Sequence, residues 1–376
     1  MVAKKSGKRS FIQWVLIILT VLSVICLFLS YAAFYISPAK VWFLAFFGLA
    51  YPLILAVNIL FVILWLFLLK KYIWIPLIAI LIGISHVLSF IQIRSTDALP
   101  ASGSLKVLSY NIHGESEYYK KPSLNGNISP VFKYISEEQP HILCLQEFYL
   151  KSKDSTKVLE QISDSINMKY FYYKNYYTSK TKRKIDALLI FSKYPIVRQG
   201  FIQNDHESTF AVYVDIMIRD EIIRVYNVHL ESFHFGQEDY TFYSDIAEAE
   251  TPKTPLKEAA IKIIMKLRKG YELRAKQVDK LSSSIKRSPY PKLVCGDLND
   301  TPTSYTLQVL SSGLKDSFKK AGNGFFGNTY GGNFPSFRID YILFDEKFEA
   351  YNYLKYKIFL SDHYPISTYI NIHPAR

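Results

Sequence analysis

Long apolar runs fill the first quarter of the chain. Residues 11–36 carry no charged side chain, and about 20 apolar residues suffice to cross a bilayer as a helix. A second run covers residues 41–69, where Pro52 is expected to kink the helix, and a third covers residues 72–93. A cleaved signal peptide is the competing interpretation, but its apolar region would be ~7–15 residues long and end in a small-residue cleavage site. The pattern therefore predicts a membrane anchor of three transmembrane helices in residues 1–95.

The pattern changes after a linker of small and polar residues, 96–104. From residue 105 onward, short apolar segments alternate with amphipathic ones. The predicted strands are residues 105–110, 142–146, 187–191, 210–218, 222–229, 292–295, 338–344 and 366–372. The predicted helices are residues 128–138, 156–167, 272–286 and 304–311. Strands in direct succession, mixed with strand–helix–strand units, predict an α/β domain with mixed sheets over residues 105–376.

One segment, residues 231–270, exceeds what such a core needs. Its first part, residues 233–243, is rich in aromatic side chains. Its second part resembles a basic amphipathic helix, with apolar Ile261, Ile264 and Leu267 among Lys257, Lys262, Lys266, Arg268 and Lys269. Three interpretations stay open: a flap that shapes the substrate site, a helix lying on anionic lipid, and a solvated surface helix.

Charge is distributed unevenly along the chain. Of the formal net charge of +13, residues 1–100 carry +7 and residues 101–376 carry +6. The second part is therefore moderately basic, which favours an anionic substrate or an anionic surface but falls short of the charge typical of nucleic-acid-binding proteins.

The basic residues near the apolar runs predict an orientation. They concentrate in the leader and after the second run, at Lys4, Lys5, Lys8, Arg9, Lys70 and Lys71, while the loop between the first two runs offers only Lys40. By the positive-inside rule, the leader and the Lys70–Lys71 loop are cytoplasmic. In a bacterium this predicts a multi-pass protein of the inner (cytoplasmic) membrane, with residues 105–376 on the extracytoplasmic side.

Polar residues follow several of the predicted strands. Asp297 and Asn299 come directly after the apolar strand at residues 292–295, and two residues apart in extended chain they point the same way. Such a pair can orient a water molecule and hold a phosphoryl oxygen, or share the coordination shell of a metal. Matching acidic, amide and imidazole groups stand at residues 109–112, 145–147 and 361–365. Together they predict a site for metal-assisted phosphoryl transfer.

Six short segments in order extend this pattern: SYNIHG at 109–114, LQE at 145–147, NVHLE at 227–231, GDLN at 296–299, RIDYI at 338–342 and SDHYP at 361–365. Together they resemble the endonuclease/exonuclease/phosphatase superfamily, which includes deoxyribonucleases, neutral sphingomyelinases and inositol-polyphosphate 5-phosphatases. The resemblance covers residues 105–372. It implies a four-layer sandwich of two mixed β-sheets flanked by helices, and a metal-dependent phosphoric ester hydrolase.

The resemblance also implies roles for individual residues. Mg²⁺, with Mn²⁺ as the alternative, is expected to be held by Glu147, Asn111 and Asp362. The catalytic residues are expected to be Asp297 and Asn299, which orient the water, the pair His363 and Asp340, which assists its activation, and His229, which faces the developing charge. Arg338 is expected to bind the phosphate, with a structural salt bridge as the alternative. No motif role falls to His113, His141, His206 or His234, which are expected to be surface or supporting residues.

These features combine into one functional hypothesis. The chain is expected to be a membrane-anchored, Mg²⁺-dependent phosphoesterase that hydrolyses phosphodiester or phosphomonoester bonds, with lipid headgroups among the candidate substrates. The expected partners are the phosphoester substrate and membrane lipid, and no obligate protein partner is evident. One alternative is an extracytoplasmic nuclease that binds DNA or RNA. A second is a catalytically silent membrane scaffold, which would be expected to have lost some of the site residues.

Overall fold

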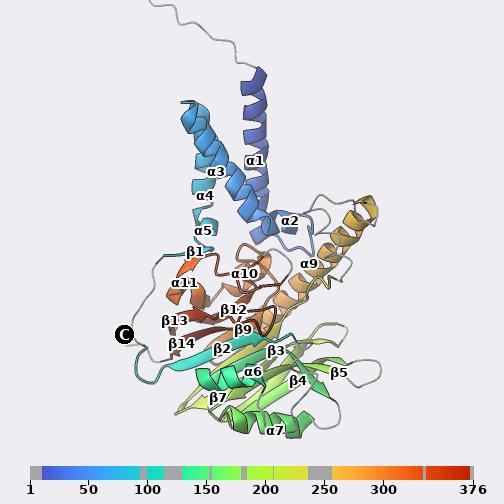
Figure 1. Ribbon diagram of the computed structural model, residues 1–376, viewed down its shortest axis with the longest axis vertical. Coiled ribbons are helices and arrows are strands. Elements are labelled where there is room, and N and C mark those ends of the chain that lie inside the picture. Colours follow the sequence, from blue (N-terminus) through green and yellow to red (C-terminus); the bar gives the residue numbers. More distant parts are fainter. Residues whose placement is uncertain are drawn as a thin grey trace, which may run out of the picture. The chain divides into compact units, whose positions relative to one another are not determined.

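A computed structural model describes residues 11–93, 100–113, 129–151, 155–178, 184–205, 207–235, 256–332 and 336–372 (Figure 1). The chain divides into two compact units. The first runs to Ser89 and includes Thr303–Tyr305, and the second consists of Phe90–Pro302 and Thr306–Arg376. Residues 94–99, which include the start of the predicted linker, lie outside the described part, as do residues 236–255 of the predicted insertion.

Helices make up the first unit: α1 (Phe11–Tyr35), α2 (Leu44–Leu49), α3 (Tyr51–Phe67), α4 (Trp74–Ile82) and α5 (Ile84–Val87), with a 3₁₀ turn at Lys71–Ile73. Among the described residues, one helix, α1 with 25 residues, is long and apolar enough to cross a membrane. The prediction of three transmembrane helices is therefore corrected, because the second and third apolar runs form shorter helices.

Both shorter runs are interrupted for identifiable reasons. The second run is not kinked at Pro52 but broken before it: α2 ends at Leu49, and α3 begins with Pro52 in its first turn, where a missing N–H costs nothing. The third run breaks at Gly83, between α4 and α5. The ring of Tyr31 from α1 lies 2.0 Å from where a Cβ on Gly83 would stand, so only glycine admits this contact.

Polar side chains of the first unit face its interior. Asn58 of α3 donates to the Ser23 carbonyl oxygen at 3.1 Å, and Trp65 donates to the Thr20 hydroxyl at 3.0 Å. Large apolar side chains are exposed instead, including Ile18, Leu22, Ile25, Leu53 and Leu60. Large apolar side chains on the outside are unusual for a surface in contact with water, and in the interior polar side chains stand beside apolar ones such as Leu27.

Two six-stranded sheets form the second unit. The first sheet has the order β13 (Glu349–Lys355), β14 (Ile366–Asn371), β2 (Leu105–Asn111), β3 (Ile142–Lys151), β5 (Lys184–Ser192) and β4 (Tyr170–Thr178). The second has the order β10 (Leu314–Asp316), β12 (Asp340–Asp345), β9 (Lys292–Asp297), β8 (Glu221–His229), β7 (Thr209–Ile218) and β6 (Ile196–Gln203). In both sheets the central pair, β2–β3 and β8–β9, is parallel and its neighbours are antiparallel.

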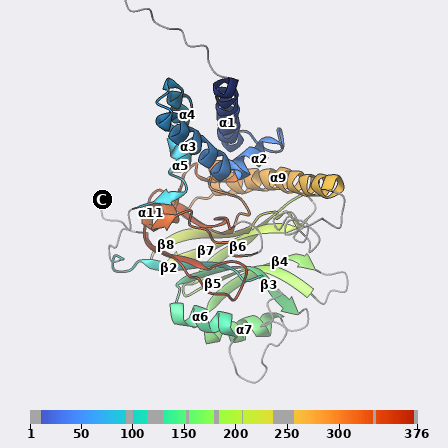
Figure 2. The ribbon, with the colours of Figure 1, turned by 45° about the horizontal axis from the view of Figure 1, so that its top comes forward.

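Alternation of side chains along the strands separates two cores. Val107, Cys144 and Ile190 point between the sheets and pack against residues such as Val225 and Cys295 of the second sheet. Residues adjacent to these in sequence, such as Leu108, Leu145 and Leu189, point the other way. This second core is closed by α6 (Pro130–Glu138) and α7 (Ser155–Ser165), which cover the outer face of the first sheet (Figure 2).

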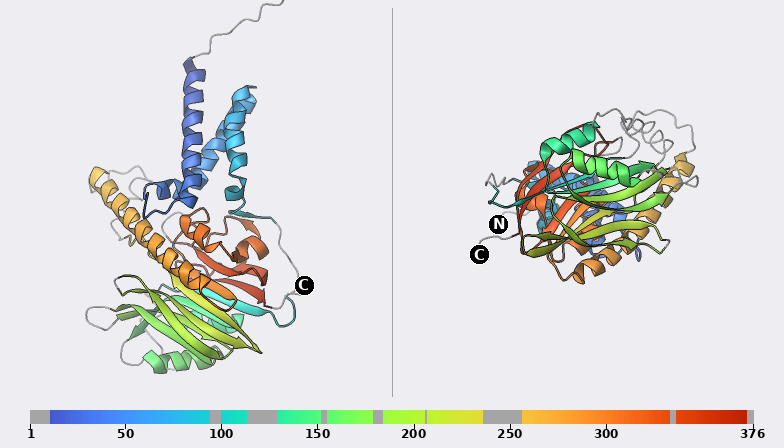
Figure 3. Two further views of the ribbon diagram at one scale, coloured as in Figure 1. Left: turned by 180° about the vertical axis from the view of Figure 1, so that it is seen from behind. Right: turned by 90° about the horizontal axis from the view of Figure 1, so that it is seen from below.

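A 31-residue helix, α9 (Leu256–Lys286), lies along the second sheet (Figure 3). The hydroxyls of Ser284 on α9 and Tyr226 on β8 lie 3.3 Å apart. The remaining described elements are α10 (Tyr305–Leu310), α11 (Ser317–Ala321) and the short pair β1 (Ile91–Gln92) and β11 (Gly324–Phe325). Two mixed sheets flanked by helices confirm the predicted fold class.

All eight predicted strands form. The predicted helices form as well, but the one at residues 272–286 is the second half of α9, which is continuous with the basic segment before it. Strands β4, β6, β10 and β13 were not predicted, because their partly exposed or tyrosine-rich faces lack a clear apolar alternation. The two-residue strands β1 and β11 and the five-residue helix α11 were not predicted either.

Gly296, the residue before Asp297, offers a test of how tightly β8 and β9 approach. It has φ +137°, and an added Cβ would lie 1.9 Å from the Val228 carbonyl oxygen. Gly296→Ala should therefore destabilise the fold by at least about 2 kcal/mol, measured as thermal unfolding of the detergent-solubilised chain. Gly313→Ala is the control: it also has a positive φ, +93°, but no atom within 4 Å, so a smaller loss is expected. Equal losses would contradict the close approach.

Candidate active site

The sheet topology brings distant segments to one edge. Because β9 is parallel to β8 and antiparallel to β12, the last residue of β8, the last of β9 and the first of β12 stand in register. His229 is paired with Asp297, and Asp297 with Asp340. In the first sheet, Asn111 ends β2, and Asp362 and His363 shortly precede the antiparallel β14. The polar strand ends of both sheets therefore face each other.

Several site residues occupy the last of the alternate strand positions whose side chains face the core between the sheets. On β9 the row runs from Leu293 through Cys295 to Asp297, and on β12 Asp340 precedes Ile342 by two positions. The side chains at the ends of these rows are nearly inaccessible: Asn111 is 0% exposed, Asp297 1%, Asp340 2% and His363 5%. The alternation that builds the core thus aims these polar groups at one another.

Glu147 reaches the same place by a different route. The pairing of β3 with β5 shifts between Leu145 and Phe148, and Glu147 has φ +52°. A bulge redirects a side chain out of the regular alternation. A left-handed backbone conformation is unfavourable for a residue other than glycine, and it is found only where the surrounding structure enforces it. The Asn111 amide then bridges two carboxylates, donating to Glu147 Oε1 and Asp297 Oδ2 at 3.1 Å each.

Two imidazoles flank Asp297. His363 Nδ1 donates to Asp340 Oδ2 at 2.9 Å, and its Nε2 lies 3.7 Å from Asp297 Oδ2. His229 Nε2 lies 3.8 Å from the same oxygen and 3.4 Å from Glu147 Oε1. At these two longer separations, an oxygen atom to the side of each pair can stand within hydrogen-bond distance of both the carboxylate and the imidazole.

Support for the His363–Asp340 pair comes from residues that the sequence analysis missed. The Thr329 hydroxyl accepts from the Asp340 backbone N–H at 3.0 Å. The Tyr330 ring meets the His363 ring edge to face, with centroids 5.2 Å apart. Both residues belong to an irregular segment without a motif, so no sequence signal marked them.

His113, which was expected to be a surface or supporting residue, lies beside the cluster. Its Nδ1 lies 3.4 Å from Glu147 Oε2 and 3.6 Å from Asp362 Oδ1, so it joins these two carboxylates. The hydrogen bond with Glu147 raises the pKa of His113 to about 9. Its position two residues after Asn111, in the same motif, was the available signal.

The charges of the cluster are strongly coupled. Burial raises the pKa of Asp297 to about 6, helped by Asp340 and opposed by the two histidines. Burial acts to lower the pKa of His363, but Asp340 and Asp297 outweigh it and raise this pKa to about 10. Burial also acts to raise the pKa of Glu147, yet His113 and His229 hold it well below its usual range. At neutral pH, Glu147 and most of Asp297 are therefore ionised, and His363 is a cation.

Asn299 and Arg338 stand apart from the reacting groups. The Asn299 backbone N–H donates to Asp297 Oδ1 at 2.7 Å, while its side chain donates to the Leu230 carbonyl oxygen at 2.9 Å. Arg338 is 2% exposed and pairs with Asp316 at 2.6 Å, packed over the rings of Phe318 and Tyr341. This is the structural salt bridge that the sequence left open, and the structure does not bring Arg338 into the cluster.

The cluster offers ligands for a metal ion. Ligand atoms of Asp297, Asp340 and His363 all lie within 4.8 Å of one another. Glu147 and Asp362 supply further carboxylate oxygens beside His113. The Asn111 amide nitrogen donates to Glu147 and Asp297, and its oxygen accepts from the His113 backbone N–H. Hard oxygen donors suit Mg²⁺ and Mn²⁺.

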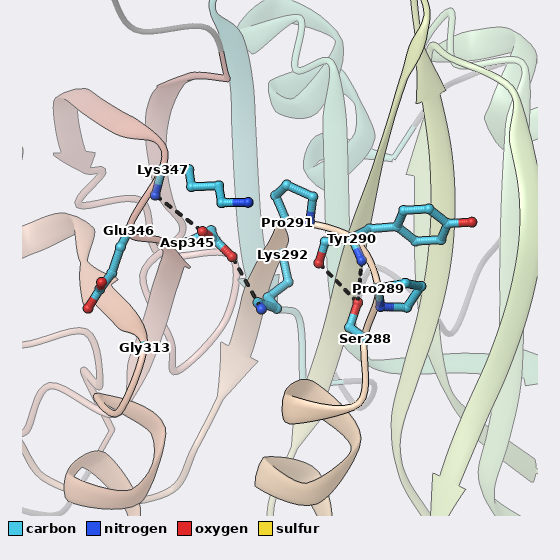
Figure 4. A pocket seen from close by; sticks show the side chains of 9 residues that line it. All are labelled: Ser288, Pro289, Tyr290, Pro291, Lys292, Gly313, Asp345, Glu346 and Lys347. Carbon is cyan, nitrogen blue, oxygen red and sulfur yellow. Dashed lines mark hydrogen bonds and ion pairs between the residues drawn. The ribbon is translucent and has the colours of Figure 1, made fainter. Parts of the chain in front are cut away.

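A separate cavity lies at the other end of β9 (Figure 4). Its lining includes Lys292, the first residue of β9, together with Asp345 and Lys347. Lys292 Nζ lies 3.3 Å from Asp345 Oδ2, so these charges offset each other. None of the predicted site residues lines this cavity.

Comparison with known proteins identifies the class. The model of the Endonuclease/Exonuclease/phosphatase family matches residues 108–363, and the chain belongs to this family. Its members are typically hydrolases that act on phosphoester bonds, commonly with divalent metals. A second model, a domain of unknown function (DUF8431), matches residues 13–90. No curated protein matches the chain.

Several solved structures are similar to this chain at low sequence identity. An endonuclease/exonuclease/phosphatase from Beutenbergia cavernae has a TM-score of 0.49 and 14% identity over 72% of each chain. The human Nocturnin catalytic domain with bound sulfate has a TM-score of 0.48 and 15% identity, over 73% of this chain and 96% of that one. The 3′ phosphatase NExo from Neisseria, bound to a product DNA hairpin, has a TM-score of 0.47 and 15% identity, over 71% and 99%.

Proposed function

We propose that the chain hydrolyses a phosphoester bond by in-line attack of water on phosphorus, at the cluster around Asp297. The observation that carries this proposal is the arrangement of Asp297 Oδ2, which accepts from Asn111 and stands 3.7 and 3.8 Å from the imidazoles of His363 and His229. An ionised carboxylate between two imidazoles can hold a water and take its proton, while the His363 cation faces the phosphate.

The roles divide according to these positions. Asp297 orients the water and accepts its proton, because a pKa of about 6 suits a base that works near neutrality. Asn299 fixes the carboxylate through its backbone N–H. His363, held by Asp340, orients the same water and faces the phosphoryl oxygens as a cation. His229 faces the charge that develops on the phosphate or on the leaving group.

Mg²⁺, with Mn²⁺ as the alternative, would be held by the carboxylates of Glu147 and Asp362, with the Asn111 amide donating to Glu147. This location is preferred over Asp297, Asp340 and His363 because the His363 Nδ1 already donates to Asp340, while Glu147 stays ionised at neutral pH. When bound, the ion would offset negative charge on the phosphoryl oxygens and the leaving group.

We further propose the division of the chain as residues 1–95 for the anchor, 96–104 for the linker and 105–376 for the catalytic domain. Attachment to a membrane is supported by the length of α1 and by the exposed apolar side chains of the first unit. A phosphoester on a lipid headgroup is then the substrate within easiest reach. DNA or RNA is the competing substrate.

A substrate panel on the full chain in lipid nanodiscs tests this assignment. It compares bis-p-nitrophenyl phosphate, p-nitrophenyl phosphate, headgroup phosphoesters of vesicle lipids, and plasmid DNA. Turnover of a lipid phosphoester well above that of DNA is expected. Faster cleavage of plasmid DNA would favour the nuclease, and no turnover of any phosphoester by the folded chain would favour the silent scaffold.

The orientation of the chain gives another prediction. If α1 crosses the membrane with the basic leader in the cytoplasm, alkaline phosphatase fused after Ile93 should be active. An inactive fusion, with a cytoplasmic reporter active at the same position, would place the catalytic unit inside the cell.

A further inference from the structure

The first half of α9 is more exposed than the second. Between residues 257 and 269, Ile261 is 51% exposed, Ile264 41% and Met265 55%, while Ala259 and Leu267 are buried. In the second half, Tyr271, Arg274, Ala275, Val278 and Leu281 are all buried. The helix therefore packs firmly along one part of its length and presents three large apolar side chains on the other.

These three side chains form a single face. They stand at positions i, i+3 and i+4, which share one side of a helix. Four basic residues border this face. Lys257 and Arg268 extend it toward the two ends of the helix, and Lys262 and Lys269 lie along its side. Residues 257–269 hold five basic side chains, including Lys266, and one acidic side chain, Glu258. Arg268 also contacts Glu272 at 2.8 Å, so part of its charge is offset.

We propose that this face of α9, defined by Ile261, Ile264 and Met265 with their bordering lysines and Arg268, docks on an anionic lipid surface. Apolar side chains enter the boundary between headgroups and acyl chains, while long basic side chains extend along it to reach lipid phosphates. Charge complementarity selects anionic over neutral lipid. The proposal concerns how the site meets a membrane and holds for any phosphoester that the site cleaves.

The second half of α9 connects this face to the active site. Arg274 Nε donates to the Glu231 carbonyl oxygen at 3.0 Å, and its Nη1 lies 3.4 Å from Asp300 Oδ2. Gln277 accepts from the Glu231 backbone N–H at 2.8 Å. These contacts hold the segments that follow His229 and Asn299. Because α9 is continuous, docking of its first half fixes the direction in which the site faces.

Depth-dependent quenching in nanodiscs tests the proposal without any assay of activity. The full chain carrying Met265→Cys is labelled with a bimane and placed in nanodiscs with nitroxide-labelled lipid, either phosphatidylcholine alone or with phosphatidylglycerol. Ser283→Cys, exposed on the second half of the same helix, is the matched control. The native cysteines Cys26, Cys144 and Cys295 contribute a background signal. This background is measured on wild-type protein treated with the same label and is subtracted.

We expect quenching at position 265 to exceed that at position 283 by about twofold or more in anionic nanodiscs. Quenching at position 265 should fall with added salt. It should also fall in the double variant Lys257→Gln, Lys269→Gln, whose unfolding temperature should stay unchanged because these side chains are exposed. Equal quenching at the two positions, or equal quenching in neutral and anionic discs, overturns the proposal. A change in bimane fluorescence at position 265 on addition of DNA also overturns the proposal, since the face would then bind nucleic acid. The same holds for a change with protein concentration in the absence of lipid, since the face would then bind a second copy.

Discussion

Asp297→Asn should lower kcat for a phosphodiester by roughly 10²-fold or more, the common size of a lost acid–base or positioning group. The substitution keeps the shape of the side chain and an oxygen that can accept from the Asn299 backbone N–H. It removes the negative charge between the two imidazoles and the capacity to take a proton. Unfolding temperature and metal affinity of the variant should stay close to those of the wild type, which separates a chemical loss from a structural one.

The pH dependence of the wild-type rate follows from the same carboxyl. Asp297 accepts a proton only when ionised, and burial raises its pKa to about 6. The rate should therefore increase with pH and level off at or below about pH 7, since a bound cation favours the ionised form. Asp297→Asn should lose this acid limb. A wild-type rate that falls as pH rises from 5 to 7 would contradict the role of Asp297 as proton acceptor.

His363→Ala should cost a similar factor, because His363 acts on the same water. Nε2 of His363 and Oδ2 of Asp297 lie 3.7 Å apart, so one oxygen atom can contact both. Residues that act as a unit are not additive. The double variant should therefore lose much less than the product of the two single losses, and strictly multiplicative losses would mean that the two groups act in separate steps.

The second large effect concerns Glu147. Glu147→Gln should raise the Mg²⁺ concentration needed for half-maximal activity by about 10-fold or more, because it removes a charged oxygen ligand. Excess Mg²⁺ should restore part of the rate. Glu346→Gln, at an exposed carboxylate, is the control and should leave the Mg²⁺ requirement unchanged. An unchanged requirement in Glu147→Gln would move the metal to Asp297, Asp340 and His363.

The sequence predicted the parts of the site that depend on local alternation. A strand whose odd positions are apolar, such as Leu293 and Cys295, indicates that the next odd position, Asp297, faces the same way. The order of motifs then marked the same positions on other strands. Alternation does not predict which strands pair with one another. His229, Asp297 and Asp340 are neighbours only because β8, β9 and β12 are adjacent in one sheet.

The features that the sequence did not predict depend on departures from regular strand and helix geometry. Glu147 reaches the cluster through a bulge, and alternation alone would have turned it away. His113, Thr329 and Tyr330 lie in irregular chain, where spacing carries no direction. The third apolar run was predicted to be one uninterrupted helix, because its break at Gly83 depends on Tyr31, more than 50 residues earlier. Arg338 lies beside Asp340 in sequence, yet its charge is directed to Asp316.

The central claim is that the cluster around Asp297 is a metal-dependent centre for phosphoester hydrolysis. Its most direct test is the rate of bis-p-nitrophenyl phosphate hydrolysis by the purified full chain, measured with Mg²⁺, after exhaustive chelation, and after Mg²⁺ is returned, with Asp297→Asn measured in parallel. The account predicts a rate that is lost on chelation, restored by Mg²⁺ and nearly absent in the variant. Full activity after chelation, or full activity in Asp297→Asn, would contradict it.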